Sequence, residues 1–289
     1  MTPAIICVMQ IYFDCYPCAL RQAVDASRMV GASTTQTKRI VLETLDILKE
    51  LPEGATPPEI VAQIQKLVQE ITGSNDPYSQ VKQESTAKAL SMLPELRKII
   101  AASKDPFETA IRISIAGNII DFGPKQDYDL WEIIEQALTS DLAVNDLPAL
   151  RSQLTSEHSV LMLGDNAGEH VFDMLLVETL DMPVTYAVRG GPVLNDVTIE
   201  DARAIGLDKV AEVIDNGARV PGTVLPLCSQ SFQERFKSAD LILSKGMGNY
   251  ESLSEVHAPI FFLFRVKCPV ICTDIHAPLN SIVVKENRV

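Results

Sequence analysis

The chain has 289 residues, 46% of them hydrophobic and 22% charged, which is typical of a soluble globular protein. Its net charge of −13 disfavours nucleic acid and anionic membranes as main partners. No apolar run approaches the ~18 residues that cross a bilayer, and the first residues lack the basic leader of a secretion signal. Six cysteines in a chain of this length favour reduced thiols, so we expect a cytoplasmic protein.

Helical periodicity dominates the first half of the chain. Apolar residues recur at helical spacing over residues 16–154, and one of the expected helices covers 57–71. A longer helix is expected over 81–102, with Pro94 as a point where it could kink or break. We therefore predict a helical N-terminal domain over residues 1–155.

The second half changes to short apolar runs that alternate with helical patterns, which indicates βαβ units and a parallel sheet. The expected strands are 160–163, 184–188, 211–214, 241–243 and 260–264, with 270–271 as a further candidate. We predict an α/β fold in which residues 156–289 form a Rossmann-like α/β/α sandwich with a mostly parallel sheet. The helical part would pack against it and leave a cleft between them.

The segment Gly164-Asp165-Asn166 is the most informative part of the chain. It follows an apolar run and precedes the helical pattern of 169–180, so it should lie at the carboxyl end of a buried strand, beside a helix N-terminus. Two oxygen ligands on one turn suit a divalent cation such as Mg2+ or Mn2+. The alternative is that Asp165 and Asn166 form the turn and cap the helix.

Similar loops follow the next three apolar runs. Residues 189–198, 215–219 and 244–251 all combine glycine with Asp, Asn, Arg or Lys. Because the carboxyl ends of parallel strands lie along one edge of a doubly wound sheet, these loops should converge. The repetition favours a ligand site over four separate turns.

Taken together, these motifs resemble the damage-control phosphatase family, also known as domain of unknown function 89, and the resemblance spans nearly the whole chain. It implies a helical N-terminal portion, a Rossmann-like α/β/α portion, and metal-dependent hydrolysis of phosphomonoesters such as sugar phosphates or damaged phosphometabolites. The segments that carry the resemblance are Gly164-Asp165-Asn166-Ala167-Gly168-Glu169, Arg189-Gly190-Gly191-Pro192 with Asn195-Asp196-Val197-Thr198, Lys245-Gly246-Met247-Gly248-Asn249-Tyr250-Glu251, and the prokaryotic-type Cys15-Tyr16-Pro17-Cys18.

The resemblance implies that Asp165, Asn166 and Asp196 hold one divalent cation, with Mg2+, Mn2+, Co2+ and Ni2+ as candidates, and that Lys245 contacts the phosphate. A phosphomonoester dianion repels nucleophiles, so its hydrolysis needs positive charge. A cation would hold a phosphate oxygen and lower the pKa of a bound water, while Lys245 adds a point charge. We favour a metal-activated water over an aspartyl-phosphate formed on an acid such as Asp165, and the second route stays open.

Other residues complete the predicted substrate site. Gly246 begins a segment whose N–H groups could cradle phosphate oxygens, and Asn249 lies in the same segment. Arg189 either binds phosphate or pairs with a local acid. Family members place an Asn and an Asp from the helical part near the cleft, and Asn118 and Asp121 match them best.

Cys15 and Cys18 begin a helix, where the helix dipole lowers a thiol pKa. A redox pair and a zinc site shared with Cys268 and Cys272 are alternatives, and we favour a structural or cleft-lining role. Arg21, one turn later, either binds an anion at the cleft or forms an exposed salt bridge.

The predicted substrate is a small phosphorylated metabolite, with no nucleic-acid or membrane partner and a homo-oligomer as an open alternative. A nucleotide-binding enzyme such as a dehydrogenase or methyltransferase is a second hypothesis, but the turn after the first strand lacks GxGxxG. A non-enzymatic metal or ligand sensor would keep the same ligands and also stays open.

Overall fold

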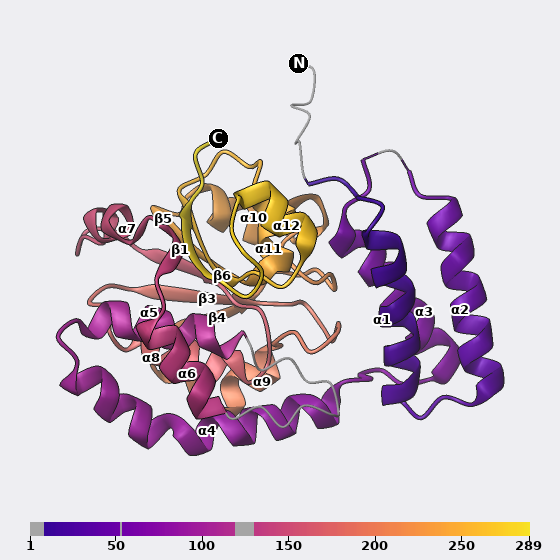
Figure 1. Ribbon diagram of the computed structural model, residues 1–289, viewed down its shortest axis with the longest axis horizontal. Coiled ribbons are helices and arrows are strands. Elements are labelled where there is room, and N and C mark those ends of the chain that lie inside the picture. The colour runs from indigo at the N-terminus through magenta and orange to yellow at the C-terminus, as the bar shows by residue number, and fades with distance from the viewer. Residues whose placement is uncertain (1–8, 53, 119–129) are drawn as a thin grey trace.

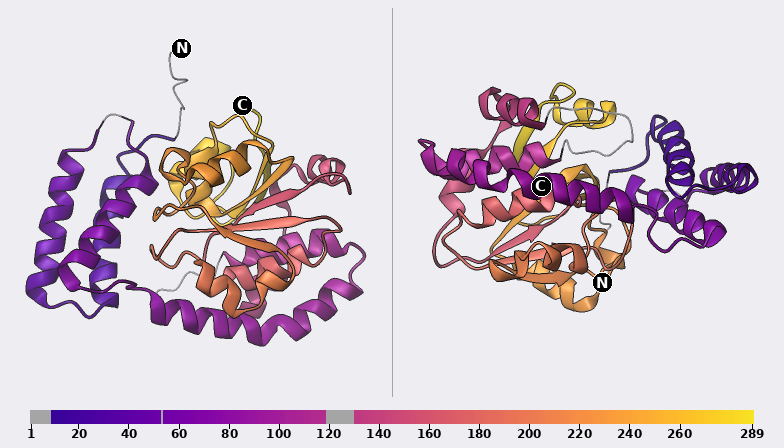
Figure 2. Two further views of the ribbon diagram at one scale, coloured as in Figure 1. Left: turned by 180° about the vertical axis from the view of Figure 1, so that it is seen from behind. Right: turned by 90° about the horizontal axis from the view of Figure 1, so that it is seen from below.

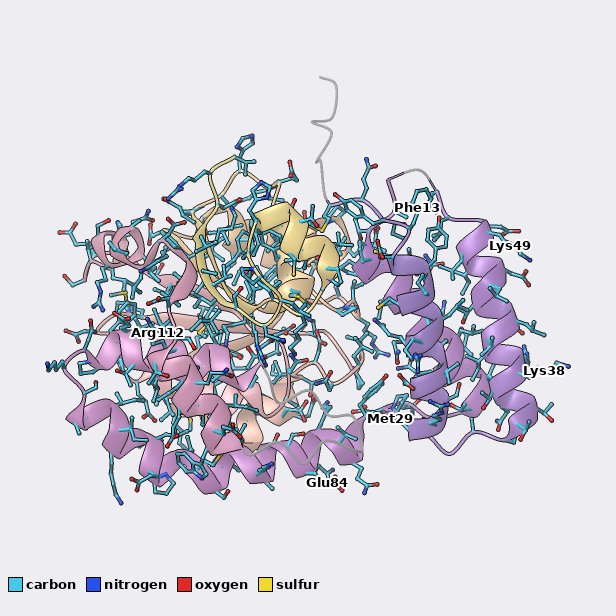
Figure 3. All side chains as sticks on the ribbon, in the orientation of Figure 1. Phe13, Met29, Lys38, Lys49, Glu84 and Arg112 are labelled. Atoms are coloured by element: carbon cyan, nitrogen blue, oxygen red, sulfur yellow. The ribbon has the colours of Figure 1, made fainter. Side chains whose placement is uncertain are left out.

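The computed structural model describes residues 9–52, 54–118 and 130–289. Figure 1 shows a helical bundle beside a larger layered part. The bundle comprises α1 (Cys15–Met29), α2 (Thr34–Lys49) and α3 (Pro57–Thr72). Its core holds fully buried Ala23, Ile40 and Ile64, one from each helix. Figure 3 shows charged side chains of α2, such as Lys38 and Lys49, pointing away from this core.

Local sequence signals begin the bundle helices. The Ser33 side chain accepts the backbone N–H of Gln36, whose own side chain accepts the Ser33 N–H, so a capping box starts α2. Thr56 and Glu59 form the same motif at α3, with proline at the first helical position. These caps satisfy backbone donors that would otherwise lack partners.

The layered part is built on one sheet, which has seven strands within the described residues, in the order β1-β7-β6-β5-β2-β3-β4. Strands β6, β5, β2, β3 and β4 are mutually parallel, whereas β7 is antiparallel to β6 and parallel to β1. The strand bounds are β1 (Leu142–Asn145), β2 (Val160–Leu163), β3 (Val184–Val188), β4 (Glu212–Asp215), β5 (Leu241–Lys245), β6 (Ile260–Arg265) and β7 (Ile282–Glu286).

Helices cover both faces of this sheet, as Figure 2 shows. Alternate residues of one strand serve opposite faces, so Met162 of β2 packs in one core cluster while Leu161 and Leu163 pack in the other. One face carries α4 (Ser79–Ala102), α5 (Pro106–Gly117), α6 (Leu130–Thr139) and α8 (Glu169–Val177), and the other carries α10 (Gln230–Lys237), α11 (Gly246–Leu253) and α12 (Pro269–Ile275). Short helices α7 (Leu147–Gln153) and α9 (Ile199–Ala204) and the 3-10 turns η1 (Leu207–Lys209) and η2 (Leu225–Leu227) complete the connections.

This architecture confirms the predicted α/β class with a mostly parallel sheet, but three local predictions differ. The run 270–271 is part of α12 and not a strand, because Pro269 occupies the first helical turn and the apolar side chains bury one helical face. Strands β1 and β7 were not predicted, and β1 lies inside the range 1–155 expected to be helical. Its alternating half-buried pattern is that of an edge strand.

Helix α4 runs through Pro94 without a break. Pro94 lies on the solvent-exposed side of the helix, where water can bond the carbonyl that a proline leaves unpaired. Among the residues that the structure describes, none of the helices combines the length and hydrophobicity needed to cross a membrane.

Candidate active site

Three polar loops meet at the carboxyl ends of neighbouring strands. β2 pairs with β3 on one side and with β5 on the other, so the residues that follow them are adjacent. Asp165 and Asn166 follow β2, Arg189 follows β3, and Lys245 ends β5. This is the sheet edge at which open α/β folds bind ligands.

The backbone holds Asp196 against the loop that follows β2. Asn166 and Asp196 form an isolated antiparallel bridge. The N–H of Ala167 donates to the carbonyl of Asn195, and the N–H of Val197 donates to the carbonyl of Asp165, both at 2.8 Å. The loop that leaves β3 at Arg189 therefore returns to the end of β2.

One buried guanidinium lies beside both acids. Arg189 Nε donates to Asp196 Oδ2 at 2.6 Å, and Arg189 Nη2 lies 3.6 Å from Asp165 Oδ1. On the other side, Asn166 Nδ2 donates to Asp165 Oδ2 at 2.7 Å. Asp165, Asn166 and Asp196 therefore meet around one arginine and one backbone bridge, and their role as ligands of a shared ion stays a prediction.

Glu169 belongs to this cluster, although it was not among the predicted site residues. Asn118 Nδ2 donates to Asp165 Oδ2 and to Glu169 Oε2, both at 3.0 Å, and Asn166 Nδ2 lies 3.1 Å from Glu169 Oε2. An acid in the first turn of a helix has an ordinary explanation in the helix dipole, so no separate signal in the sequence marked Glu169 as a site residue. Asn118 thus lies beside the acids, its role in substrate binding stays a prediction, and Asp121 lies outside the described residues.

Lys245 is buried behind the cluster. Its Nζ lies 2.6 Å from Asp173 Oδ1, 2.7 Å from Glu169 Oε1 and 2.7 Å from the Ser114 hydroxyl. Tyr186 donates its hydroxyl proton to the other oxygen of Asp173 at 2.7 Å. The ammonium group is fully engaged, so the predicted contact between Lys245 and a phosphate would require an exchange of partners.

Burial dominates the electrostatics of the site. It raises the pKa of Asp165, and the nearby charges of Glu169 and Asp196 raise it further, against the opposing effect of Arg189. Burial also raises the pKa of Asp196. The contacts described above join four buried acids to two buried bases, namely Asp165, Glu169, Asp173, Asp196, Arg189 and Lys245.

This donor set fits a divalent cation. With all groups ionised, the cluster carries an excess of two negative charges, which a hard dication would compensate, and carboxylate and amide oxygens are its preferred ligands. Among the described residues, no three His, Cys, Asp or Glu side chains gather in metal-binding geometry. The predicted set of Asp165, Asn166 and Asp196 differs from such a group because one of its three ligands is an amide.

The turn at the end of β5 leaves room for the Asp165 carboxylate. Gly246 has a left-handed φ of 76°, and a methyl group on it would overlap the Asp165 carboxylate. Asn249 is buried, donates to the carbonyls of Gly164 and Lys245 at 3.1 and 2.7 Å, and accepts from the Thr223 hydroxyl at 2.7 Å. Asn249 therefore joins β5 to β2, and its predicted role in substrate binding stays a prediction.

Cys15 and Cys18 lie at the start of α1 and make none of the hydrogen bonds or ion pairs described above. Burial raises the pKa of both thiols, and the charges of Glu251 and Cys268 add to the effect. This direction is opposite to the lowered pKa that the helix dipole predicted. Arg21 is exposed.

Residues 11–283 match the family described as the damage-control phosphatase ARMT1-like domain. The chain belongs to this family. A damage-control phosphatase of Pyrococcus horikoshii is 32% identical, with 97% of this chain and 99% of that protein covered. One of Archaeoglobus fulgidus is 33% identical, with 96% and 99% covered.

A solved structure extends the likeness to the fold. The crystal structure of a DUF89 family protein from Pyrococcus horikoshii covers 97% of this chain with a TM-score of 0.88 and 32% identity. The family resemblance seen in the sequence motifs is thereby confirmed. Membership of the ARMT1-like family supports a phosphatase, and hence a hydrolase, acting on a small molecule.

Proposed function

We propose that this protein is a metal-dependent phosphatase that hydrolyses small phosphomonoesters. The observation that supports the proposal most is the meeting of Asp165, Asn166 and Asp196 beside one buried arginine, within a cluster that has excess negative charge. The family names of the relatives point to the same reaction class.

Asp165, Asn166 and Asp196 would hold the cation. When bound, a divalent cation supplies a Lewis acid for a phosphate oxygen and acidifies a water molecule. The Asn118 amide, which donates to Asp165, would orient that carboxylate.

The chain itself offers positive groups to the phosphate. Arg189 Nη2 makes no hydrogen bond within the described residues and only a 3.6 Å ion pair with Asp165 Oδ1, so it would donate to a phosphate oxygen. The first N–H groups of α11, at Gly246 and the residues after it, lack partners within the helix and favour an anion. Lys245 would contribute indirectly, because its ammonium group pairs with the Glu169 carboxylate and neutralises that charge.

Phosphate release from a panel of phosphorylated metabolites would test the proposal. The assay uses Mg2+, Mn2+, Co2+ or Ni2+, and a chelator in parallel. We expect turnover only with a cation, and a loss on the order of 100-fold or more in Asp165→Asn and Asp196→Asn. Asp208→Asn, an exposed acid outside the cluster, should retain full activity.

Circular dichroism would establish that each variant is folded. Undiminished turnover in the chelator, or in folded Asp196→Asn with the cation present, would reject the assignment.

A further inference from the structure

A cavity of about 660 Å³ lies between α3 and the loops that follow β3 and β4. Its wall includes Ala62, Gln65 and Gln69 from α3, Pro192 and Val193 from the loop after β3, and Arg219 from the loop after β4. The cavity therefore lies between the helical bundle and the part of the molecule that carries the candidate active site.

Gln65 is an unusual residue for this position. Its side chain is 1% exposed, yet neither its amide nitrogen nor its amide oxygen has a hydrogen-bond partner among the described residues. A buried amide without a partner is costly to a folded protein, and native structures contain few such groups. An unsatisfied donor and acceptor on a residue that lines a cavity indicate a ligand that satisfies them.

The periodicity of α3 explains why Gln65 faces this cavity. Ile60 and Ile64 pack in the bundle core, whereas Ala62 packs against the core of the layered part. Gln65 lies three residues after Ala62 and so shares its face of the helix. An apolar residue at position 65 would bury more hydrophobic surface and leave no polar group unpaired. The presence of an amide there therefore calls for a functional explanation.

The loop after β3 connects this cavity to the active site. Arg189 and Asp196, at the two ends of the loop, belong to the acidic cluster, and Pro192 and Val193 between them line the cavity. Gln69 Nε2 lies 3.4 Å from the carbonyl oxygen of Pro192 and ties α3 to the loop. One short loop thus contributes residues to both places.

The lining favours an uncharged, hydroxyl-bearing group. Its charged residues are balanced, with Lys66 and Arg219 against Glu59 and Glu70. The free groups of Gln65 are one amide donor pair and one amide acceptor, and a hydroxyl both donates and accepts.

We propose that this cavity receives the hydroxyl-bearing organic part of the substrate and that Gln65 recognises one of its hydroxyl groups. The inference rests on the proposed phosphatase function, because the phosphate of the same molecule would lie at the acidic cluster. Gln65 is then a residue that determines specificity and does not take part in the chemistry.

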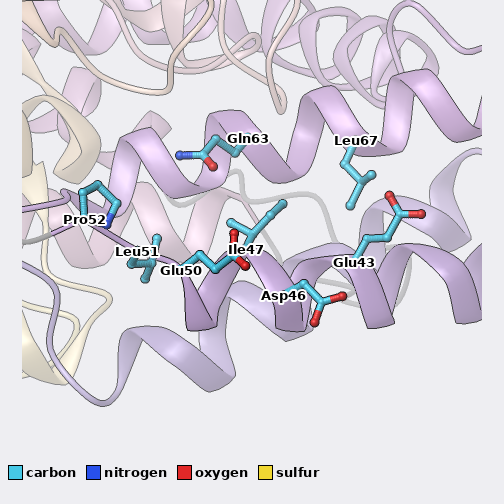
Figure 4. A pocket seen from close by; sticks show the side chains of 8 residues that line it. All are labelled: Glu43, Asp46, Ile47, Glu50, Leu51, Pro52, Gln63 and Leu67. Carbon is cyan, nitrogen blue, oxygen red and sulfur yellow. The ribbon is translucent and has the colours of Figure 1, made fainter.

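A second hollow, between α2 and α3, carries no comparable argument. It has a volume of about 380 Å³, and Figure 4 shows Glu43, Asp46 and Glu50 around it. Two of these acids already pair with basic residues of α2, Arg39 and Lys49.

The test compares Gln65→Leu with wild type and with Gln80→Leu, a matched control on the exposed side of α4. Leucine has a similar size and removes both polar groups, so we expect the variant to fold with an unchanged or higher Tm. The substrates are p-nitrophenyl phosphate, which lacks hydroxyl groups, and a set of polyol and sugar phosphates. For the best hydroxylated substrate, kcat/KM should fall about tenfold in Gln65→Leu and stay unchanged for p-nitrophenyl phosphate.

An equal fall for both substrates, or none for either, would overturn the proposal. Ligand-observed NMR with the same polyol phosphates separates this failure from failure of the phosphatase function. If wild type binds them but releases no phosphate, the function is wrong, while weaker binding by Gln65→Leu still supports the cavity. Absence of binding by wild type overturns the inference.

Discussion

At the scale of single residues, Gly246 shows how backbone conformation serves the site. Glycine adopts this positive φ at little energetic cost, whereas any other residue would be strained. The missing Cβ also leaves room for the Asp165 carboxylate. Gly31 has a similar φ of 63°, but a Cβ there would meet nothing within 4 Å. Alanine substitutions at Gly246 and Gly31 therefore distinguish the effect of backbone strain from the effect of steric conflict.

We therefore expect Gly246→Ala to lose activity by on the order of 100-fold, because the displaced carboxylate can no longer share a ligand with Asp196. Both Gly246→Ala and Gly31→Ala should cost about 1–2 kcal/mol of unfolding free energy from the left-handed backbone. Urea unfolding and phosphate release would measure the two effects. Full activity in Gly246→Ala would show that the Asp165 position is not critical.

At the scale of elements, Lys245 connects three segments of the layered part. It ends β5 and bonds Ser114 of α5 and Glu169 and Asp173 of α8. The ion pairs are fully buried, so their loss leaves acids without a partner. The same contacts place α5 and α8 relative to the sheet edge on which the site lies.

Replacing Lys245 by methionine should lower the unfolding free energy by about 3–5 kcal/mol, because Glu169 and Asp173 would remain buried and unpaired. Lys49→Met removes an exposed lysine that pairs with Asp46, and it should leave the urea midpoint unchanged. A small effect of Lys245→Met would mean that water or protonation relieves the buried acids.

At the scale of the whole molecule, excess negative charge is concentrated at one buried point of a chain whose net charge is −13. A ligand that binds only the folded state stabilises it in proportion to the logarithm of its concentration. The proposed cation should therefore make the whole protein harder to unfold, independently of any assay of turnover.

Mn2+ at 100 times its Kd should raise the unfolding free energy by about 2.7 kcal/mol in wild type. The gain should vanish in Asp196→Asn and persist in Asp208→Asn, where the exchanged acid is exposed. Chemical denaturation with and without a chelator would measure it. Equal stabilisation of all three proteins would indicate binding elsewhere.

Local patterns in the amino-acid sequence were enough to predict several features of this protein. Strands β2, β3 and β5 were located from apolar runs that end in loops with glycine and charged residues. The order of the motifs indicated the family and the α/β class. Local signals failed for β1 and β7, because these two strands pair with each other although they lie far apart in the chain. They also failed for α12, where a proline outweighed two β-branched residues.

The burial of polar groups and the identity of their partners became known only from the folded chain. Glu169 resembles an ordinary acid at a helix start, and Gln65 an ordinary polar residue of a helix, until their neighbours are known. Lys245 resembled a phosphate ligand until its ammonium was found bonded to three buried residues, Ser114, Glu169 and Asp173. The physical reason is that burial and partner choice arise from packing between distant segments, which local spacing does not encode.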